Sequence, residues 1–270
     1  LYFDLGAGGG SSHTLTGNSS QQPSTTTQGV VTQTHALVGA GTQQTTETSQ
    51  GAVSQAHVLL GSSVEQSSAT TQGAVSQSSA LVGAGVEQSA TTSQAAITQE
   101  QTITSGQTQQ DSQTSQGTVS QAHVLQGTGA EQTATTTSAA IGSAGTLSGS
   151  SIQQLAITSQ GAISQTHILV AAAVAADAEA SSSAIVQDHI LQGSNVIQVV
   201  QTTQDAIDLS FTHNLGGSAV EQAGQTSSGA VAQTQVLTGA GTQQTAETGS
   251  GAITQAQTLS GAGAEQTAAT

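Results

Sequence analysis

Hydrophobic and polar residues alternate along this chain, and the alternation itself recurs at a fixed distance. In the segment that begins at Gln50, the residues Val53, Gln55, His57 and Leu59 alternate with small or polar side chains. Alternation with a period of 2 that includes β-branched residues predicts a strand and not a helix. The same pattern returns every 22 residues along most of the chain. We therefore expect a tandem array of strand-forming units.

The array covers nearly the whole chain. A degenerate unit, Gly6 to Thr27, precedes eleven regular ones, and two residues are inserted near Phe211 to Gly217. We expect this insert to bulge from the fold as a loop. On this basis residues 1–27 form an N-terminal segment with a degenerate first repeat, and residues 28–270 form the regular repeat region. The regular units begin at Gln28, Gln50, Gln72, Gln94, Gln116, Ser138, Gln160, Ser182, Gln204, Ser228 and Ser250.

Numbering each unit from 1 to 22 shows which positions are restricted. Position 4 is Val or Ile and position 10 is Leu or Ile, while Gly at position 12 and Gly or Ser at position 14 predict a turn. Each unit then reads as strand, turn, strand, turn. If the two strands of a unit face each other, position 10 lies opposite 15, 8 opposite 17, 6 opposite 19 and 4 opposite 21. The hydrophobic columns begin with Val31, Val53, Val75, Leu37, Leu59 and Leu81.

A single unit is too short to bury a face alone, but stacked units can bury one together. The sequence therefore predicts an all-β fold, a β-solenoid of about twelve coils with one repeat and two strands per coil. This arrangement also buries columns of glutamine, which is favourable only if each amide bonds the identical amide one coil away. We expect such in-register ladders at positions 6 and 17. The ladder residues are Gln33, Gln55, Gln77, Gln99, Gln121, Gln165 and Gln187, and Gln44, Gln66, Gln88, Gln110 and Gln132.

Composition excludes several classes of partner. The chain has no Lys or Arg and a net charge of −15, so nucleic acid, which is bound through cationic side chains, is not an expected partner. The longest apolar run, Ile168 to Ala176, is shorter than the roughly 20 residues of a membrane-spanning helix. Without cysteine there is no disulfide or thiolate metal site. Because trypsin-like proteases have nothing to cleave, the composition favours an extracellular or cell-surface location.

Two titratable columns recur in the repeat. Histidine occupies position 8 in several units and would stack on neighbouring coils about 4.8 Å apart, as a polar column or as a metal or pH-sensing site. Because Ser79 and Gln101 replace it, we favour the polar column, with His57 facing Gln66, and expect no cofactor. Glutamate recurs at the outward position 16, either as a solvated charge row that preserves solubility or as a row of like charges that slows premature assembly. The candidate histidines are His13, His35, His57, His123, His167 and His189.

No motif indicates an enzyme. The sequence lacks a Gly-x-Ser-x-Gly elbow, and Asp188 next to His189 is not by itself a catalytic arrangement. Ice binding would need a regular Thr-x-Thr array on every coil, and outward pairs such as Ser67 with Ala69 break that array.

The period, the two strands per coil, the paired Gln columns and the Gly turn resemble the curlin subunits of bacterial curli, and are similar to curlin-like proteins that anchor a holdfast. The chain departs from curlin repeats in its Val, Ile and Leu columns, its missing Asn column and its larger number of repeats. The resemblance implies a secreted subunit of an extracellular amyloid-like fibre, serving adhesion or a biofilm matrix. The partner would be a second copy, stacked head to tail, with lateral packing through the often apolar position 9. A monomeric stalk of an adhesin and an ice-binding solenoid are the alternatives. The closest unit runs from Gln72 to Ser93 and carries Gln77, Gly83, Ala84, Gly85, Gln88 and Ala90.

Overall fold

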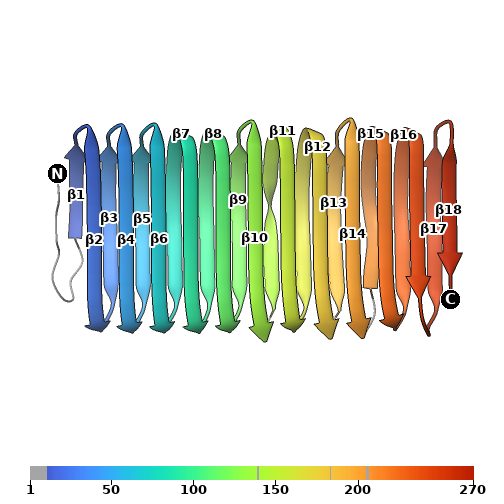
Figure 1. The fold of residues 1–270 in the computed structure, drawn as a ribbon, viewed down its shortest axis with the longest axis horizontal. Coiled ribbons are helices and arrows are strands. Elements are labelled where there is room, and N and C mark those ends of the chain that lie inside the picture. Colours follow the sequence, from blue (N-terminus) through green and yellow to red (C-terminus); the bar gives the residue numbers. More distant parts are fainter. Residues whose placement is uncertain (1–10, 139, 183, 205–206) are drawn as a thin grey trace.

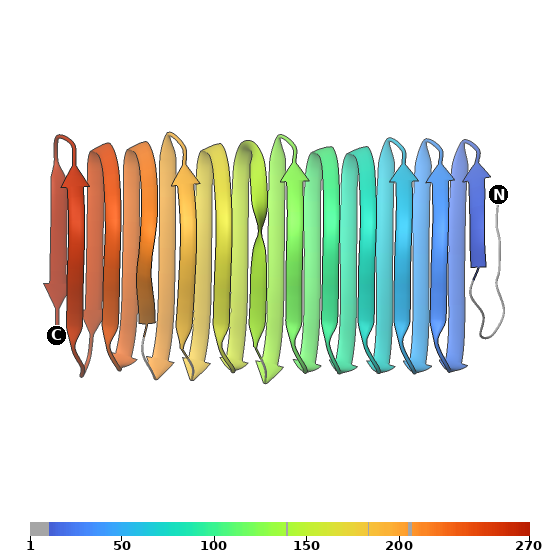
Figure 2. The same cartoon turned by 180° about the vertical axis from the view of Figure 1, so that it is seen from behind.

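The protein is a straight rod in which strands lie side by side across the long axis (Figure 1). This computed structural model describes residues 11–138, 140–182, 184–204 and 207–270. Viewed from behind, the rod shows the same succession of strands, from the first described strand at one end to the last at the other (Figure 2). Within the described residues no helix is long and apolar enough to cross a membrane.

Eighteen strands make up the part of the rod that the structure describes. Six coils consist of two strands separated by a turn, and the other six are described as one long strand each, so the described part contains the twelve coils that the repeat predicts. We number these coils 1 to 12 from the N-terminus. The strands are β1 (Ser11–Thr16), β2 (Ser19–Gln28), β3 (Val31–Val38), β4 (Gly41–Gln50), β5 (Val53–Leu60), β6 (Ser63–Gln72), β7 (Val75–Gln94), β8 (Ile97–Gln116), β9 (Val119–Gln126), β10 (Gly129–Ser138), β11 (Ile141–Gln160), β12 (Ile163–Ser182), β13 (Ile185–Gln192), β14 (Asn195–Gln204), β15 (Ile207–Ser228), β16 (Val231–Thr248), β17 (Ile253–Ser260) and β18 (Ala264–Ala269).

Neighbouring coils pair in parallel and in register. In β3 and β5, for example, Val31 pairs with Val53 and His35 pairs with His57, exactly one repeat apart. The same register holds in the second half of the coil, where Gln44 in β4 pairs with Gln66 in β6. The predicted fold class, an all-β parallel solenoid with stacked Gln columns, is confirmed.

The two-residue insertion does not form the loop that we expected. Residues 207–228 stay in the single strand β15, and the register against β16 shifts between Ser210 and His213. Beyond the shift, β14 pairs with β15 at a wider sequence separation than one repeat, as for Asn195 and Ala219. A β-bulge can absorb extra residues without breaking the ladder, because only the local hydrogen bonds are disturbed.

The core of the rod has two apolar seams. The first consists of positions 10 and 15, such as Leu81 and Val86, and the second joins position 4 to Ala or Val at position 19, such as Val75 and Ala90. The seams explain why the Val, Ile and Leu columns are so regular, since burying each such side chain contributes about 1.5–3 kcal/mol. The prediction that position 4 faces position 21 needs correction, because Thr at position 21 bonds the turn instead. Thr92 Oγ1 donates to the Gly73 carbonyl at 3.2 Å.

The second turn carries glycine at position 2 in most of the coils, a column that we did not use as a turn signal above, and Ala95 takes this place in coil 5. Gly73 has a φ of +136°, and a Cβ at this residue would lie 1.6 Å from the Gly51 carbonyl oxygen of the preceding coil. Glycine is the residue that tolerates such a φ, and here it also allows the turns to stack. At position 12 the stacking distance alone is decisive, because a Cβ on Gly61 would lie 2.5 Å from the Gly39 oxygen.

Candidate functional surfaces and the polar core

Between the two apolar seams lies a column of buried amides. Gln77 Nε2 donates to Gln55 Oε1 of the preceding coil at 3.0 Å, and Gln99 Nε2 donates to Gln77 Oε1 at 2.8 Å. At position 17, Gln88 Nε2 donates to Gln66 Oε1 at 3.1 Å and crosses the core to Gln77 Oε1 at 3.1 Å. The amides therefore point the same way along the rod, and each coil requires the next one to complete its hydrogen bonds.

Hydroxyl groups at position 19 complete the amide network. Ser68 Oγ donates to Gln55 Oε1 of its own coil at 2.5 Å and accepts from Gln77 Nε2 of the next coil at 2.9 Å. This contact fits the expectation that position 6 lies opposite position 19. A buried polar column of this kind is favourable where its donors and acceptors find partners inside the rod, as those of Gln55 and Gln77 do.

The ladders are interrupted in coils 7 and 8. Ser143 replaces Gln at position 6, and Ala176 replaces Gln at position 17; both are buried. Gln132 and Gln154 turn toward Ser143, and its Oγ lies 3.0 Å from Nε2 of His167. Because the serine side chain is smaller than glutamine, polar groups of coils 6, 7 and 8 come together around Ser143.

The histidines whose side chains the structure describes lie inside the rod. His35, His57, His123, His167 and His189 are all buried; the side chains of His13 and His213 lie outside the described part. His57 contacts Gln44 of the preceding coil, with 2.6 Å between Nε2 and Nε2, and not Gln66 as expected. The rings of His35 and His57 stack at 5.3 Å between centroids.

Three of these buried rings are held neutral. Burial is the main cause that lowers the pKa of His57, His123 and His167 from 6.5 to about 3, with smaller contributions from the neighbouring His35 at His57 and from His123 at His167. The Nδ1 atom of His57 accepts the His35 backbone N–H at 3.2 Å, which requires that nitrogen to be unprotonated. Among the described residues, no three His, Asp or Glu side chains come together.

The outward side chains divide into two unlike faces. The acid face consists of outward positions 16, 18, 20 and 22 in the second half of each coil, and the apolar face of positions 5, 7, 9 and 11 in the first half. Asp188 projects outward on the apolar face, whereas His189 points into the core, so these neighbours in sequence do not meet. The acid face carries Glu47, Glu65, Glu87, Asp111, Glu131, Asp177, Glu179, Glu221, Glu247 and Glu265.

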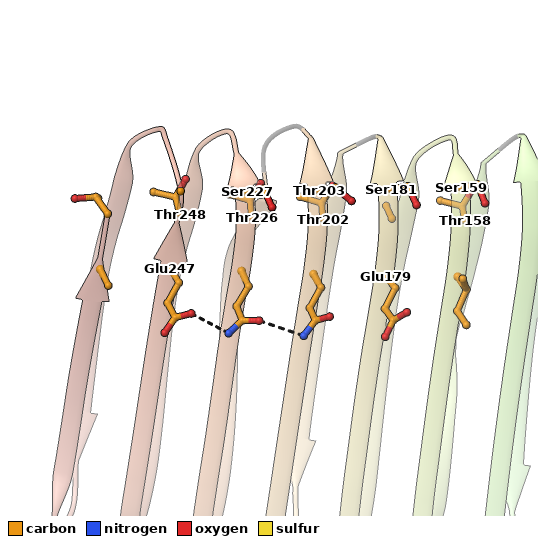
Figure 3. A pocket seen from close by; sticks show the side chains of 17 residues that line it. Thr158, Ser159, Glu179, Ser181, Thr202, Thr203, Thr226, Ser227, Glu247 and Thr248 are labelled. Carbon is orange, nitrogen blue, oxygen red and sulfur yellow. Dashed lines mark hydrogen bonds between the residues drawn. The ribbon is translucent and has the colours of Figure 1, made fainter.

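A groove of about 710 Å³ runs along the edge of the acid face over the C-terminal half of the rod. Figure 3 shows a row of hydroxyls along this groove, including Ser181, Thr203 and Ser227, beside a second row that contains Glu179 and Glu247. In the second row Gln201 donates to Gln225 at 3.2 Å and Gln225 donates to Glu247 at 3.0 Å. The groove therefore offers hydroxyl and amide groups that repeat once per coil. Its charged side chains are the carboxylates Glu179 and Glu247, so it repels anions.

The edge strands at both ends of the described rod are paired on one side only. At the N-terminal end β1 pairs with β3 and β2 with β4, and at the C-terminal end β17 and β18 both pair with β16. The last coil is also open to solvent on its inner side, since the hydrogen-bonded pair Gln266 and Gln255 is exposed.

Comparison of this chain with known proteins finds no matching family model, no matching curated protein and no matching solved structure.

Proposed function

We propose that this chain is a structural subunit of an extracellular amyloid-like fibre, which grows by stacking the last coil of one copy on the first coil of the next. The observation that supports the proposal is the match between the two open edges. One coil spacing separates every pair of neighbouring coils, so a second copy can continue the rod with the same register. An edge of unpaired N–H and C=O groups is a template for such pairing.

Side chains at the two ends are complementary in that register. Gln266 at position 17 of the last coil would lie beneath Gln22 of the next copy, which continues the buried amide ladder. At position 16, Glu265 would lie beneath Gln21, which brings together the same two residue types, in the opposite order, as the contact in which Gln43 Nε2 donates to Glu65 at 2.9 Å. Stacking of this kind is head to tail and does not close, so it produces an unlimited filament.

Among the described residues of the first coil, Pro23 opposes stacking. It lies at position 18 of β2, in register with Thr45 of β4. In the second half of each coil, backbone N–H groups at even positions point to the preceding coil, as when Gly41 donates to Asn18 and Gly249 donates to Thr226. Proline has no N–H, so it removes one donor from the open edge without disturbing the pairing with β4.

The test is fibre growth by three versions of the purified chain. Pro23→Thr restores the donor and should speed elongation severalfold, whereas Thr25→Pro removes a second donor from the same edge and should slow it at least tenfold. Thr25→Ala keeps its N–H and serves as the matched control. Growth is followed by negative-stain microscopy and by the meridional reflection at about 4.8 Å expected of coils stacked along the fibre.

Single rods that never elongate at high concentration, in all of these variants, would refute the proposal and favour the monomeric stalk of an adhesin. No observation in the structure favours ice binding, because the outward rows of the acid face are interrupted by carboxylates such as Glu47 and Asp111.

A further inference from the structure

The apolar face is nearly free of charge while the rest of the outward surface is acidic. Among side chains whose exposure the structure describes, it carries two acids, Glu100 and Asp188, against ten on the acid face. It also holds nine of the eleven exposed large hydrophobic side chains: Val58, Leu60, Val82, Val124, Ile168, Val170, Val186, Ile190 and Val236. Exposed apolar side chains gathered on one face indicate an interaction site.

The area of this face is large enough for a stable interface. Its strands are 8 residues long in β5 and β9, so at about 3.3 Å per residue the face is about 26 Å wide. Twelve coils at about 4.8 Å give a length of about 55 Å, and hence roughly 1,400 Å² per copy. A stable protein–protein interface buries about 800 Å² per partner.

The charges identify the kind of partner. A cationic protein would be drawn to the acid face, and an anionic surface would be repelled by the whole rod. A second copy presents one broad surface that can be buried without bringing many carboxylates together, and that surface is its own apolar face.

We propose that two copies pair through their apolar faces with the rods antiparallel, related by a two-fold axis that runs parallel to the strands between coils 6 and 7. This axis places each position of coil 6 opposite the same position of coil 7, coil 5 opposite 8, and coil 4 opposite 9. At position 9, each large side chain then meets a smaller one. The pairs are Val124 with Thr146, Ile168 with Thr102, Ile190 with Ala80, and Val236 with Ala36.

The shape of the face fits the same arrangement. A shallow groove of about 670 Å³ runs over positions 7 to 9 of coils 1 to 5, where small residues such as Ala56 and Ala80 lie outward. The ridge that would enter it is formed by Ile168 and Ile190, which pair in register in β12 and β13 and are 43 % and 37 % exposed. Large side chains set opposite small ones are what close packing of two sheets requires.

The two acids of this face whose side chains the structure describes also select the antiparallel arrangement. Across the proposed axis, Glu100 lies opposite Thr166 and Asp188 lies opposite Ser78, so each carboxylate meets a hydroxyl that can donate to it. With the rods parallel, position 7 would instead lie opposite position 9 of the same coil, and Asp188 would meet Ile190. Burying a carboxylate against an aliphatic side chain without a donor is costly.

The inference rests on the proposed structural role, because it names the partner that would lie beside each rod. Its test therefore uses chains that carry Thr25→Pro, in which elongation should be at least tenfold slower, so that lateral pairing can be measured before filaments form. Sedimentation velocity should show a species of two 26.3 kDa chains. Ile190→Glu should lower the pairing affinity at least tenfold, whereas Gln153→Glu, which adds the same charge to the acid face, should leave it unchanged.

Geometry is tested by cross-linking, which is clean because the natural chain has no cysteine. Ala80→Cys and Ile190→Cys chains are mixed and treated with a bismaleimide that spans the roughly 10 Å between packed sheets. We expect a heterodimer of the two variants, and no product when Gln153→Cys replaces Ile190→Cys.

A cross-link mainly between two Ala80→Cys chains would overturn the antiparallel geometry, and chains that stay monomeric would overturn the pairing itself. Fibres built from single rods would remove this inference but keep the proposed function. If the natural chain forms lateral pairs but never elongates, the pairing is kept and the proposed fibre function is refuted.

Discussion

Protonation of the buried histidines should open the rod at specific coils as the pH falls. His57, His123 and His167 have a folded pKa of about 3, well below their ordinary value of 6.5. Because the folded state disfavours the charged ring, the unfolded state binds more protons between these two values. Stability is therefore fully present above about pH 6.5 and is lost as the pH falls toward 3.

The magnitude follows from the shift. At pH 4.5, two units below the ordinary value, each of these rings costs about 2.7 kcal/mol, since one pH unit corresponds to about 1.36 kcal/mol. The three together cost about 8 kcal/mol, which is comparable to the whole stability of an ordinary domain. In a stacked-coil protein this loss is felt locally, at coils 3, 6 and 8, because each coil contacts only its neighbours.

The chain supplies its own control at the same position. Gln101 occupies position 8 in coil 5 and is buried, as histidine is in coils 3, 6 and 8. We compare the natural chain with a triple variant, His57→Gln, His123→Gln and His167→Gln, at pH 8 and pH 4.5. Urea unfolding reports global stability, and amide hydrogen exchange reports each coil.

Most of the acid-induced loss should disappear in the triple variant, and in the natural chain coil 5 should stay more protected than coils 3 and 6 at pH 4.5. Both proteins keep the same carboxylates, so their difference isolates the imidazoles. Equal losses of stability in the two proteins between pH 8 and pH 4.5 would refute the assignment of neutral, desolvated rings.

Three further predictions follow from the stacking. Gly73→Ala should cost at least about 3 kcal/mol, from the positive φ and the overlap with backbone of the preceding coil, whereas Gly85→Ala, where nothing lies within 4 Å, should cost less than about 1 kcal/mol in urea unfolding. Gln77→Leu should cost about 2–4 kcal/mol, because the amides above and below lose partners inside the core; unchanged exchange protection in the flanking coils would contradict this. Glu65 and Glu87 lie directly beside each other in register, so replacing both by Gln should speed assembly at pH 8 and weaken its dependence on salt, measured by light scattering. Growth at pH 4 is a poor test of those carboxylates, because the buried histidines destabilise the coils in the same range.

The sequence alone was sufficient to predict the architecture, because every coil of a solenoid forms from the same local pattern of residues. Alternation around Val53 and Leu59 determines which face is buried, and the regular return of the pattern determines that coils stack. The amide columns follow from the same register, since Gln55 and Gln77 can be buried only beside each other. The glycine column at position 2 and the Thr column at position 21 carried signals in the repeat that would have identified them as turn residues.

Only the tertiary structure decided how the coils fit against each other in detail. The contact of His57 with Gln44, one coil earlier than expected, depends on the offset between the two strands of a coil, and the period does not contain that offset. The insertion near Ser210 is absorbed as a bulge because long ladders on either side hold the strand in place, a cooperative effect that no local pattern records. The separation of charge into an acid face and an apolar face also becomes visible only after both strands of every coil have been oriented in space.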